Sequence, residues 1–206
     1  AFSKHGLTVA QILLTREDVT DRRRYLSARN TILLLVEMGV VPVINENDTV
    51  TSEEIKFGDN DTLSALVAAL VDSDLLILLS DIDGLYTGDP RHDPASRLVP
   101  VVTELTPEVW SWAGKTRSTY SIGGMMTKLK AADIAMKSGT IMVIADGSLP
   151  DACVRIASGD RIGTLFLPQP KRLSRRQQWI AFGPRVHGRI VIDDGAKDAI
   201  VNAGKS

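Results

Sequence analysis

Residues 45–61 bring together amide and carboxylate side chains directly after a short apolar run at 40–44. The central members of this group are Asp48, Asn60 and Asp61. An amino-acid ligand needs such a set, because a carboxylate pairs with its ammonium group and amides or helix-start N–H groups bind its carboxylates. These three residues are therefore candidate ligand-binding residues. Ordinary turn and capping chemistry uses the same residue types and is the alternative interpretation.

A second polar cluster, SDIDGLYTGDP at 80–90, closes the apolar run 75–79. The Asp-Gly and Asp-Pro pairs within it are turn signals, and turns alone would explain them. Ser80 and Asp81 stand at the end of the run itself. That position suits them to hydrogen-bond a ligand such as a nucleotide.

A third segment combines two glycines with a lysine at the start of an expected helix. The glycines let the backbone approach a phosphate closely, and the N–H groups of the helix start attract an anion. Lys128 lies about one turn into the helix and can reach a phosphate as a point charge. The spacing is not that of a P-loop, and a glycine hinge before an ordinary helix fits the local pattern equally well. The segment comprises Ile122, Gly123, Gly124, Met125, Met126, Thr127 and Lys128.

Apolar strands alternate with helical segments through most of the chain, which predicts an α/β fold. This alternation requires a mostly parallel sheet sandwiched between helices, with ligands at the carboxyl ends of the strands. Asn60 or Asp61 is expected to cap its helix, and Gly39 and Gly139 to end theirs. The run 75–79 is predicted to be the most buried strand. Strands are expected at 9–14, 40–44, 75–79, 140–145 and 164–167, and helices at 22–38, 61–71, 107–113, 125–138 and 151–158.

Composition limits the class of protein. The chain has 206 residues, 44% of them hydrophobic, and a net charge of −1. This length suits about 1.4 domains with a core that needs no disulfide, and the balanced charge makes nucleic acid a disfavoured partner. One cysteine, Cys153, and three dispersed histidines predict no metal site, and Cys153 is expected to be a small buried residue. The longest apolar run, 65–71, is too short for a membrane span, so a cytoplasmic location is expected.

The composition changes after Leu167. Two prolines and the basic run 171–176 predict a linker at 169–184. A strand at 188–193 and a helix at 195–203 follow, and these are too few residues for an independent core. The chain is therefore divided into a large domain at 1–168, the linker, and the beginning of a second domain at 185–206. The basic run leaves an RNA-binding or regulatory module as an alternative, although a solvated linker explains it equally well.

Taken together, the three polar segments resemble the amino acid kinase family. SDIDGLYTGDP is similar to the nucleotide-binding segment of that family. INENDTVTSEEIKFGDNDTLSALVA, GGMMTK and the ending GTLF resemble its branch that phosphorylates the side-chain carboxylate of L-glutamate at the start of proline synthesis. The resemblance covers nearly the whole chain in the same order. It implies an amino acid kinase-like domain at 1–168 and, at 185–206, the start of a small PUA-like β domain.

The resemblance also implies roles for residues of this chain. Asp48 and Asn60 would hold glutamate, and Asp61 would orient the catalytic lysines. Lys128 would neutralise charge on the phosphoryl group in transit, because phosphoryl transfer depends on positioning and charge neutralisation. ATP, with Mg²⁺, would contact Ser80, Asp81 and the segment 122–128.

Two differences from the family pattern concern this ATP site. The family commonly has Thr at Ile122 and Ser at Met126, so side-chain contacts are lost there while the backbone N–H groups remain. The family domain also opens with a strand, a lysine and a glycine-rich turn, which this chain does not have before Ala1. We therefore expect a fragment that is inactive on its own.

The family resemblance implies two further properties, namely feedback inhibition by proline and assembly into a homo-oligomer. No membrane association is expected, because the longest apolar run is too short for a span. A kinase acting on another carboxylate, such as aspartate or acetylglutamate, is the alternative enzyme. The composition of residues 45–61 disfavours it.

Overall fold

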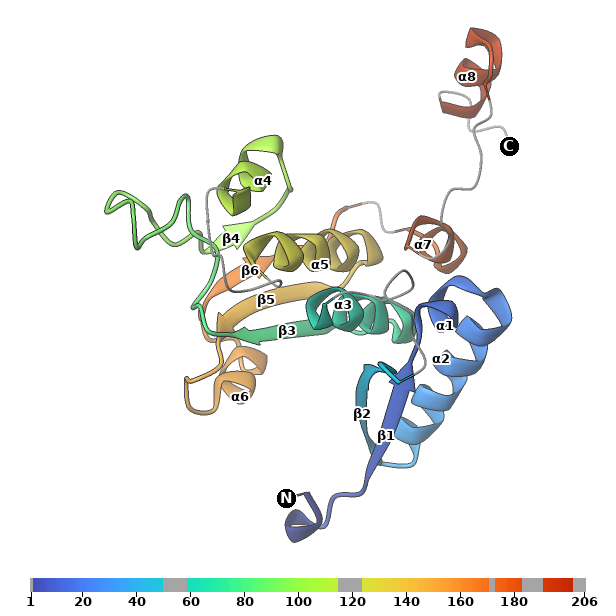
Figure 1. Ribbon diagram of the computed structural model, residues 1–206, viewed down its shortest axis with the longest axis vertical. Helices are drawn as coiled ribbons and strands as arrows, with labels where there is room; N and C mark the ends of the chain where they lie inside the picture. Colours follow the sequence, from blue (N-terminus) through green and yellow to red (C-terminus); the bar gives the residue numbers. More distant parts are fainter. Residues whose placement is uncertain (1, 50–58, 115–123, 171–172, 183–190, 202–206) are drawn as a thin grey trace.

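The computed structural model describes residues 2–49, 59–114, 124–170, 173–182 and 191–201. Its larger sheet has four strands in the order β3-β5-β6-β4 (Figure 1). Three of the four strand pairings among the described residues are parallel, and only β5 and β6 run antiparallel. The predicted α/β fold with a mostly parallel sheet is thus confirmed. The strands are β3 Leu75–Ser80, β4 Val101–Val102, β5 Ile141–Asp146 and β6 Thr164–Phe166.

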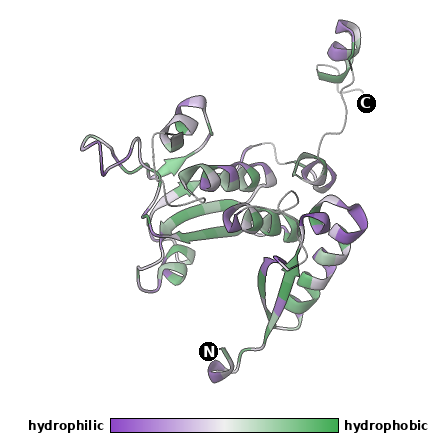
Figure 2. Cartoon of the chain, in the orientation of Figure 1, coloured by the Kyte–Doolittle hydropathy of each residue, from purple (hydrophilic) through white to green (hydrophobic). Residues whose placement is uncertain are grey.

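A second, two-stranded sheet stands apart from the first. It pairs β1 (Val9–Leu14) in parallel with β2 (Val41–Glu46). The helix α2 (Arg22–Glu37) packs along this pair after the short helix α1 (Arg16–Thr20) (Figure 1). Figure 2 shows hydrophilic colouring over the start of this helical unit and more hydrophobic colouring toward the end of α2, as its sequence predicts. The N-terminus carries a short 3-10 helix, η1 (Phe2–His5).

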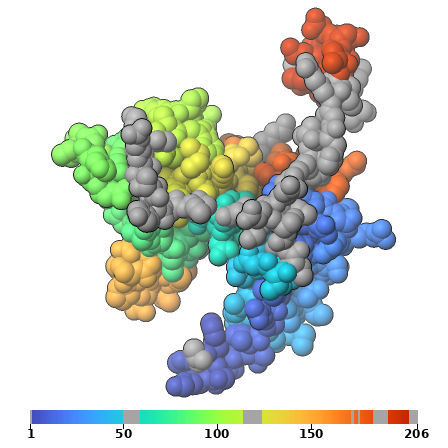
Figure 3. Space-filling model, in the orientation of Figure 1, coloured from blue at the N-terminus to red at the C-terminus, as the bar shows by residue number. Residues whose placement is uncertain are grey.

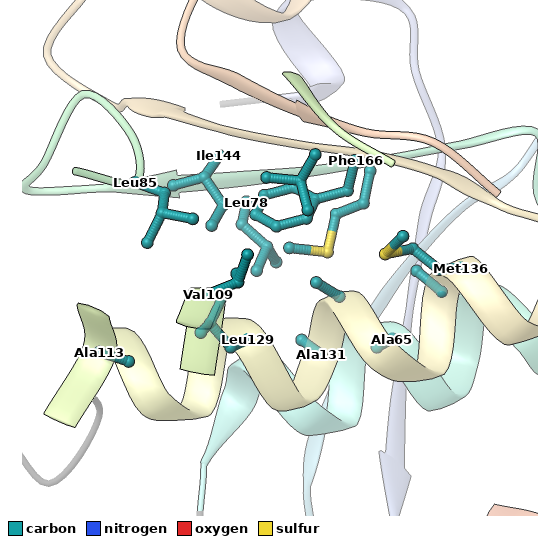
Figure 4. Close-up of a cluster of buried hydrophobic side chains, with 14 residues drawn as sticks. Ala65, Leu78, Leu85, Val109, Ala113, Leu129, Ala131, Met136, Ile144 and Phe166 are labelled. Carbon is teal, nitrogen blue, oxygen red and sulfur yellow. The ribbon is translucent and has the colours of Figure 1, made fainter. Parts of the chain in front are cut away.

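Helices cover both faces of the larger sheet. Because successive residues of a strand point to opposite faces, Met142 and Ile144 of β5 pack toward α3, α4 and α5, while Val143 and Ala145 pack toward α6. Figure 4 shows the first cluster, with side chains of the sheet on one side and those of α5 on the other. The sandwich of helices around the sheet is therefore present. These helices are α3 Asn60–Val71, α4 Pro107–Gly114, α5 Met125–Ser138 and α6 Ala152–Ala157.

Helix ends follow the capping expectations in part. Gly39 and Gly139 end α2 and α5 with φ of 72° and 84°, a left-handed conformation that glycine adopts without strain. The N-cap of α3 is Asp59, not Asn60 or Asp61 as predicted, because the Asp59 carboxylate accepts hydrogen bonds from the Thr62 N–H at 2.6 Å and its hydroxyl at 3.0 Å.

Two burial predictions were wrong. The strand β3 is not the most buried, since Leu79 is 47% exposed, and β5 takes that place. The reason is that β3 lies at the edge of its sheet in the described structure, whereas β5 is central. Cys153 is exposed, because Ala152 and Ile156 form the buried face of α6.

The segment predicted as a linker contains a helix, α7 (Arg175–Phe182). Gln178 of α7 is only 2% exposed and donates from its amide nitrogen to the Ser138 carbonyl at 3.3 Å. The guanidinium of Arg22 lies over the rings of both Trp179 and Tyr25. The helix α7 contacts both α5, which covers the larger sheet, and the α1–α2 unit, which covers the smaller one. It therefore connects the two parts of the structure.

The described residues beyond α7 are too few to test the prediction that a second domain begins at 185. The first half of the strand expected at 188–193 lies outside the described residues, and its last three residues are not in a strand. The helix α8 (Asp194–Val201) has no buried residue and stands away from the rest of the chain in Figure 1. Among the described helices, none combines the length and apolarity needed to cross a bilayer.

Thr164 offers a test of how the loop after β3 is fixed to the sheet. Its buried hydroxyl accepts from the Leu85 N–H at 2.8 Å and donates to the Val99 carbonyl at 2.7 Å. Thr164→Val keeps the shape but leaves both backbone groups without a partner, so the free energy of unfolding should fall by about 1–3 kcal/mol. Chemical denaturation measures this change. The exposed Thr103→Val is the control and should shift stability by less than about 0.5 kcal/mol; equal effects would contradict the assignment.

Candidate active site

One carboxylate joins the starts of the two central helices. Asp61, in the first turn of α3, lies 3.0 Å from Lys128 Nζ and 2.7 Å from Thr127 Oγ1, both in the first turn of α5. Lys128 is 7% exposed. A buried ammonium at the positive end of a helix dipole needs a counter-charge, and Asp61 supplies it. The lysine that the sequence singled out is thus held in one place by the aspartate that it also singled out.

A cavity of about 310 Å³ opens beside this ion pair. One wall is formed by Trp112 of α4 and by the start of α5, and the other by the loop that follows β3. Figure 3 shows this loop and α4 close together on one flank of the molecule. The cavity is lined by Asp81, Ile82, Asp83, Gly84, Leu85, Tyr86, Gly88, Asp89, Pro90, Arg91, Trp112, Gly124, Met125 and Lys128.

The loop wall is braced by its own charged residues. Asp89 is buried and receives hydrogen bonds from the Nε and Nη2 of Arg91, each at 3.0 Å. The Arg91 side chain and N–H, with His92 nearby, hold the pKa of Asp89 well below its usual range. The Tyr86 hydroxyl donates to Asp83 at 2.9 Å, and this hydrogen bond raises the pKa of Tyr86. The loop therefore presents a fixed surface to the cavity.

The close packing of this loop explains one glycine. A Cβ at Gly84 would come within 2.6 Å of Thr164 Oγ1 and 2.8 Å of Leu98 Cδ1. The Asp-Gly pair that reads as a turn signal is thus also needed for the loop to reach the sheet.

The start of α5 is suited to an anion. Gly124 is its N-cap and makes no side-chain capping hydrogen bond, so the N–H groups of the first turn are not capped by a side chain of that residue. This helix end lines the cavity together with Lys128. The positive end of the helix dipole and the Lys128 ammonium converge there, and together they favour a phosphate group.

The structure brings some of the predicted ATP-site residues together. Asp81, Gly124, Met125 and Lys128 line the cavity. Ser80 stands behind the loop and donates to Asp81 at 3.0 Å, while Thr127 contacts Asp61 rather than the cavity. Met126 is exposed and does not line the cavity. Ile122 and Gly123 lie outside the described residues.

The predicted glutamate-binding residues lie outside the cavity. Asn60 is the first residue of α3, next to Asp61, and Asp48 is exposed in the turn after β2. Neither lines the cavity of Lys128. Asn60 instead lines a separate cavity of about 390 Å³ between β2, α3 and β3.

Sequence reasoning missed the side chains that Tyr86, Arg91 and Trp112 contribute to the cavity. Tyr86 lies within the motif at 80–90 and Arg91 directly follows it, and turns alone would explain the local pattern there. Trp112 lies in α4, more than twenty residues beyond that motif, and only the packing of α4 beside α5 brings it to the cavity. A tryptophan on a short helix between two polar segments is the one signal that the sequence offers for it.

The model of the amino acid kinase family matches residues 1–146, which is more than half of the chain. The chain belongs to the amino acid kinase family. This confirms the resemblance carried by the motifs after β2 and β3 and at the start of α5.

Individual relatives are more specific. The chain is 51% identical to the glutamate 5-kinase of Thermoanaerobacter sp. strain X514 over 205 residues and 52% identical to that of Paraburkholderia phymatum. Each alignment covers all of this chain but 55% of the relative. The chain thus spans about half the length of the curated relatives that it matches.

Solved structures agree on the fold. The UMP kinase of Bacillus anthracis matches with a TM-score of 0.53 at 16% identity, covering 81% of this chain and 60% of that one. The isopentenyl phosphate kinase of T. acidophilum matches with a TM-score of 0.54 at 17% identity, covering 80% and 62%. At these identities the match concerns the fold alone.

The ion pair between Asp61 and Lys128 can be tested by stability. Asp61→Asn keeps an acceptor for Thr127 but leaves the buried ammonium without its counter-charge, so the free energy of unfolding should fall by about 1–3 kcal/mol. The control is Asp133→Asn, which removes the more exposed i,i+4 pair with Lys137 on the same helix. It should cost about 0.5 kcal/mol or less. Similar losses in urea unfolding for both variants would contradict a structural role for Asp61.

Proposed function

We propose that this chain carries the catalytic region of a glutamate 5-kinase. The reaction is transfer of the γ-phosphoryl group of ATP to the side-chain carboxylate of L-glutamate, which yields L-glutamyl 5-phosphate and ADP in the first step of proline synthesis. The observation that carries the proposal is Lys128, paired with Asp61, at the start of α5 and beside a nucleotide-sized cavity. Relatives with this name at about 51% identity over the whole chain support the choice of substrate.

The chemistry needs little from the protein beyond positioning and charge. A γ-carboxylate with an ordinary pKa of about 4.3 is already ionised near neutral pH, so its oxygen attacks the γ-phosphorus without a general base. The bond between the γ-phosphorus and the bridging oxygen breaks, and ADP leaves with the electron pair. Lys128 neutralises charge on the transferred group, and the N–H groups at the start of α5 do the same. Asp61 keeps the ammonium in place between turnovers.

Mg²⁺ enters this reaction as part of the substrate MgATP. Within the described residues, no group of three or more histidine, cysteine, aspartate or glutamate side chains is arranged to hold a metal ion. Magnesium bound chiefly through phosphate oxygens and water does not require such a cage. Asp81 and Asp83, in the loop after β3, are carboxylates that line the cavity; Asp81 accepts a hydrogen bond from Ser80 and Asp83 accepts one from Tyr86.

Glutamate would bind beyond the γ-phosphate, near Asp48 after β2 and Asn60 at the start of α3. The carboxylate of Asp48 suits the ammonium group of the substrate, and the amide of Asn60 suits a carboxylate. Asn60 directly precedes Asp61, so a substrate held there is adjacent to the ion pair with Lys128. Proline as a feedback inhibitor, a homo-oligomer, a cytoplasmic location and a PUA-like domain from 185 onward belong to the same proposal.

The test is glutamate-dependent release of ADP by the full-length protein. L-glutamate should support turnover, and L-aspartate and N-acetyl-L-glutamate should not; the reverse preference would assign the chain to another carboxylate kinase.

Lys128→Met should lower kcat by about 100-fold or more, because a charge that stabilises the transferred phosphoryl group is removed. The matched control is Lys130→Met, two residues along on the exposed face of α5, which should leave kcat unchanged. Steady-state kinetics at saturating ATP measure both variants. A Lys128→Met enzyme with near-normal kcat would remove the central residue of the proposed mechanism.

A further inference from the structure

The helix α4 holds one tryptophan against the cavity and another away from it. Val109 and Ala113 are buried in the main core and fix one face of the helix. Trp112 precedes Ala113 and lines the 310 Å³ cavity. Trp110 packs against the main core and does not line the cavity. The position of the Trp112 indole is thus set by its anchored neighbours.

The cavity has two kinds of lining. Lys128 and the start of α5 supply positive charge, which a phosphate chain requires. Ile82, Leu85 and Trp112 supply apolar and aromatic surface, which does not interact favourably with a phosphate chain. A flat heteroaromatic base is the part of a nucleotide that gains from such a wall, because its π face stacks on aromatic rings.

We propose that Trp112 is the residue on which the nucleobase packs and that it makes binding depend on the base. The inference rests on the proposed use of ATP and adds to it the orientation of the nucleotide. The phosphates lie toward Lys128 and the base toward α4. The loop carrying Tyr86 and Arg91, fixed by Asp83 and Asp89, completes the cavity on the other side.

The experiment compares ATP with inorganic tripolyphosphate, which has the phosphates but no base, by calorimetric titration of the full-length protein. Trp112→Leu keeps apolar bulk but removes the aromatic face. It should weaken ATP binding about tenfold or more, the ratio that corresponds to 1.4 kcal/mol or more, and leave tripolyphosphate binding unchanged. Trp110→Leu, on the same helix, should leave the affinity for both ligands unchanged.

A second measurement uses variants that keep an aromatic ring and therefore disturb folding least. ATP should quench the indole fluorescence of the unaltered protein. The quench should disappear in Trp112→Phe, which still binds ATP within about threefold, and persist in Trp110→Phe. Tripolyphosphate should cause no quench in any of them.

Several results would overturn the inference. These are equal losses of ATP and tripolyphosphate affinity in Trp112→Leu, no loss of either, an unchanged quench in Trp112→Phe, or no binding of ATP by the unaltered protein. Base-dependent binding through Trp112 without glutamate-dependent ADP release would leave this inference standing and refute the proposed function instead. Glutamate-dependent turnover with ATP binding insensitive to Trp112 would do the opposite.

Discussion

The pairing of Asp61 with Lys128 is the interaction on which the candidate site depends. It places a buried ammonium at the start of α5, where the helix dipole alone would oppose a positive charge. The same carboxylate contacts Thr127, so two successive residues of α5 are fixed by one residue of α3. An ammonium that is held in position before substrate arrives costs little reorganisation when charge develops on a phosphoryl group.

That pairing is possible only because α3 and α5 approach each other closely. Small side chains make the approach, among them Ala65 of α3 and Ala131, Ala132 and Ala135 of α5, all fully buried. Figure 4 shows Ala65 and Ala131 on neighbouring helices beneath the side chains of the sheet. Larger residues at these positions would separate the helix starts and lengthen the distance between Asp61 and Lys128. The apolar core thus sets the geometry of the polar site.

The sequence allowed good prediction where local signals are strong. The helix at 125–138 and the strand at 9–14 are observed with those bounds, because hydrophobic periodicity and a glycine end mark them. The residues at strand ends and helix starts were candidates for the same reason, since the fold rule says where ligands bind. Asp61, Asp81 and Lys128 followed from that rule together with their residue types.

Features that depend on tertiary contacts could not be predicted. The exposure of Leu79 results from the edge position of β3, and the exposure of Cys153 from the choice of buried face on a helix of six residues. The helix α7 lies in a basic segment between prolines, which locally indicates a linker, and its packing is decided by the buried Gln178. Trp112 belongs to the cavity only because α4 packs beside α5.

The two ends of α5 differ in a way that makes this helix suited to its role. At its C-terminal end, the carbonyls of Met136, Lys137 and Ser138 accept hydrogen bonds from the Gln169 N–H, the Leu173 N–H and the Gln178 side chain. The segment after the last strand therefore satisfies groups that a helix end leaves without partners. At the other end, the N-cap is Gly124, which has no side chain to cap the helix, and Gly124 and Met125 line the cavity. A helix that is anchored at its negative end and has its positive end at the cavity presents its dipole to an anion, as a phosphate site requires.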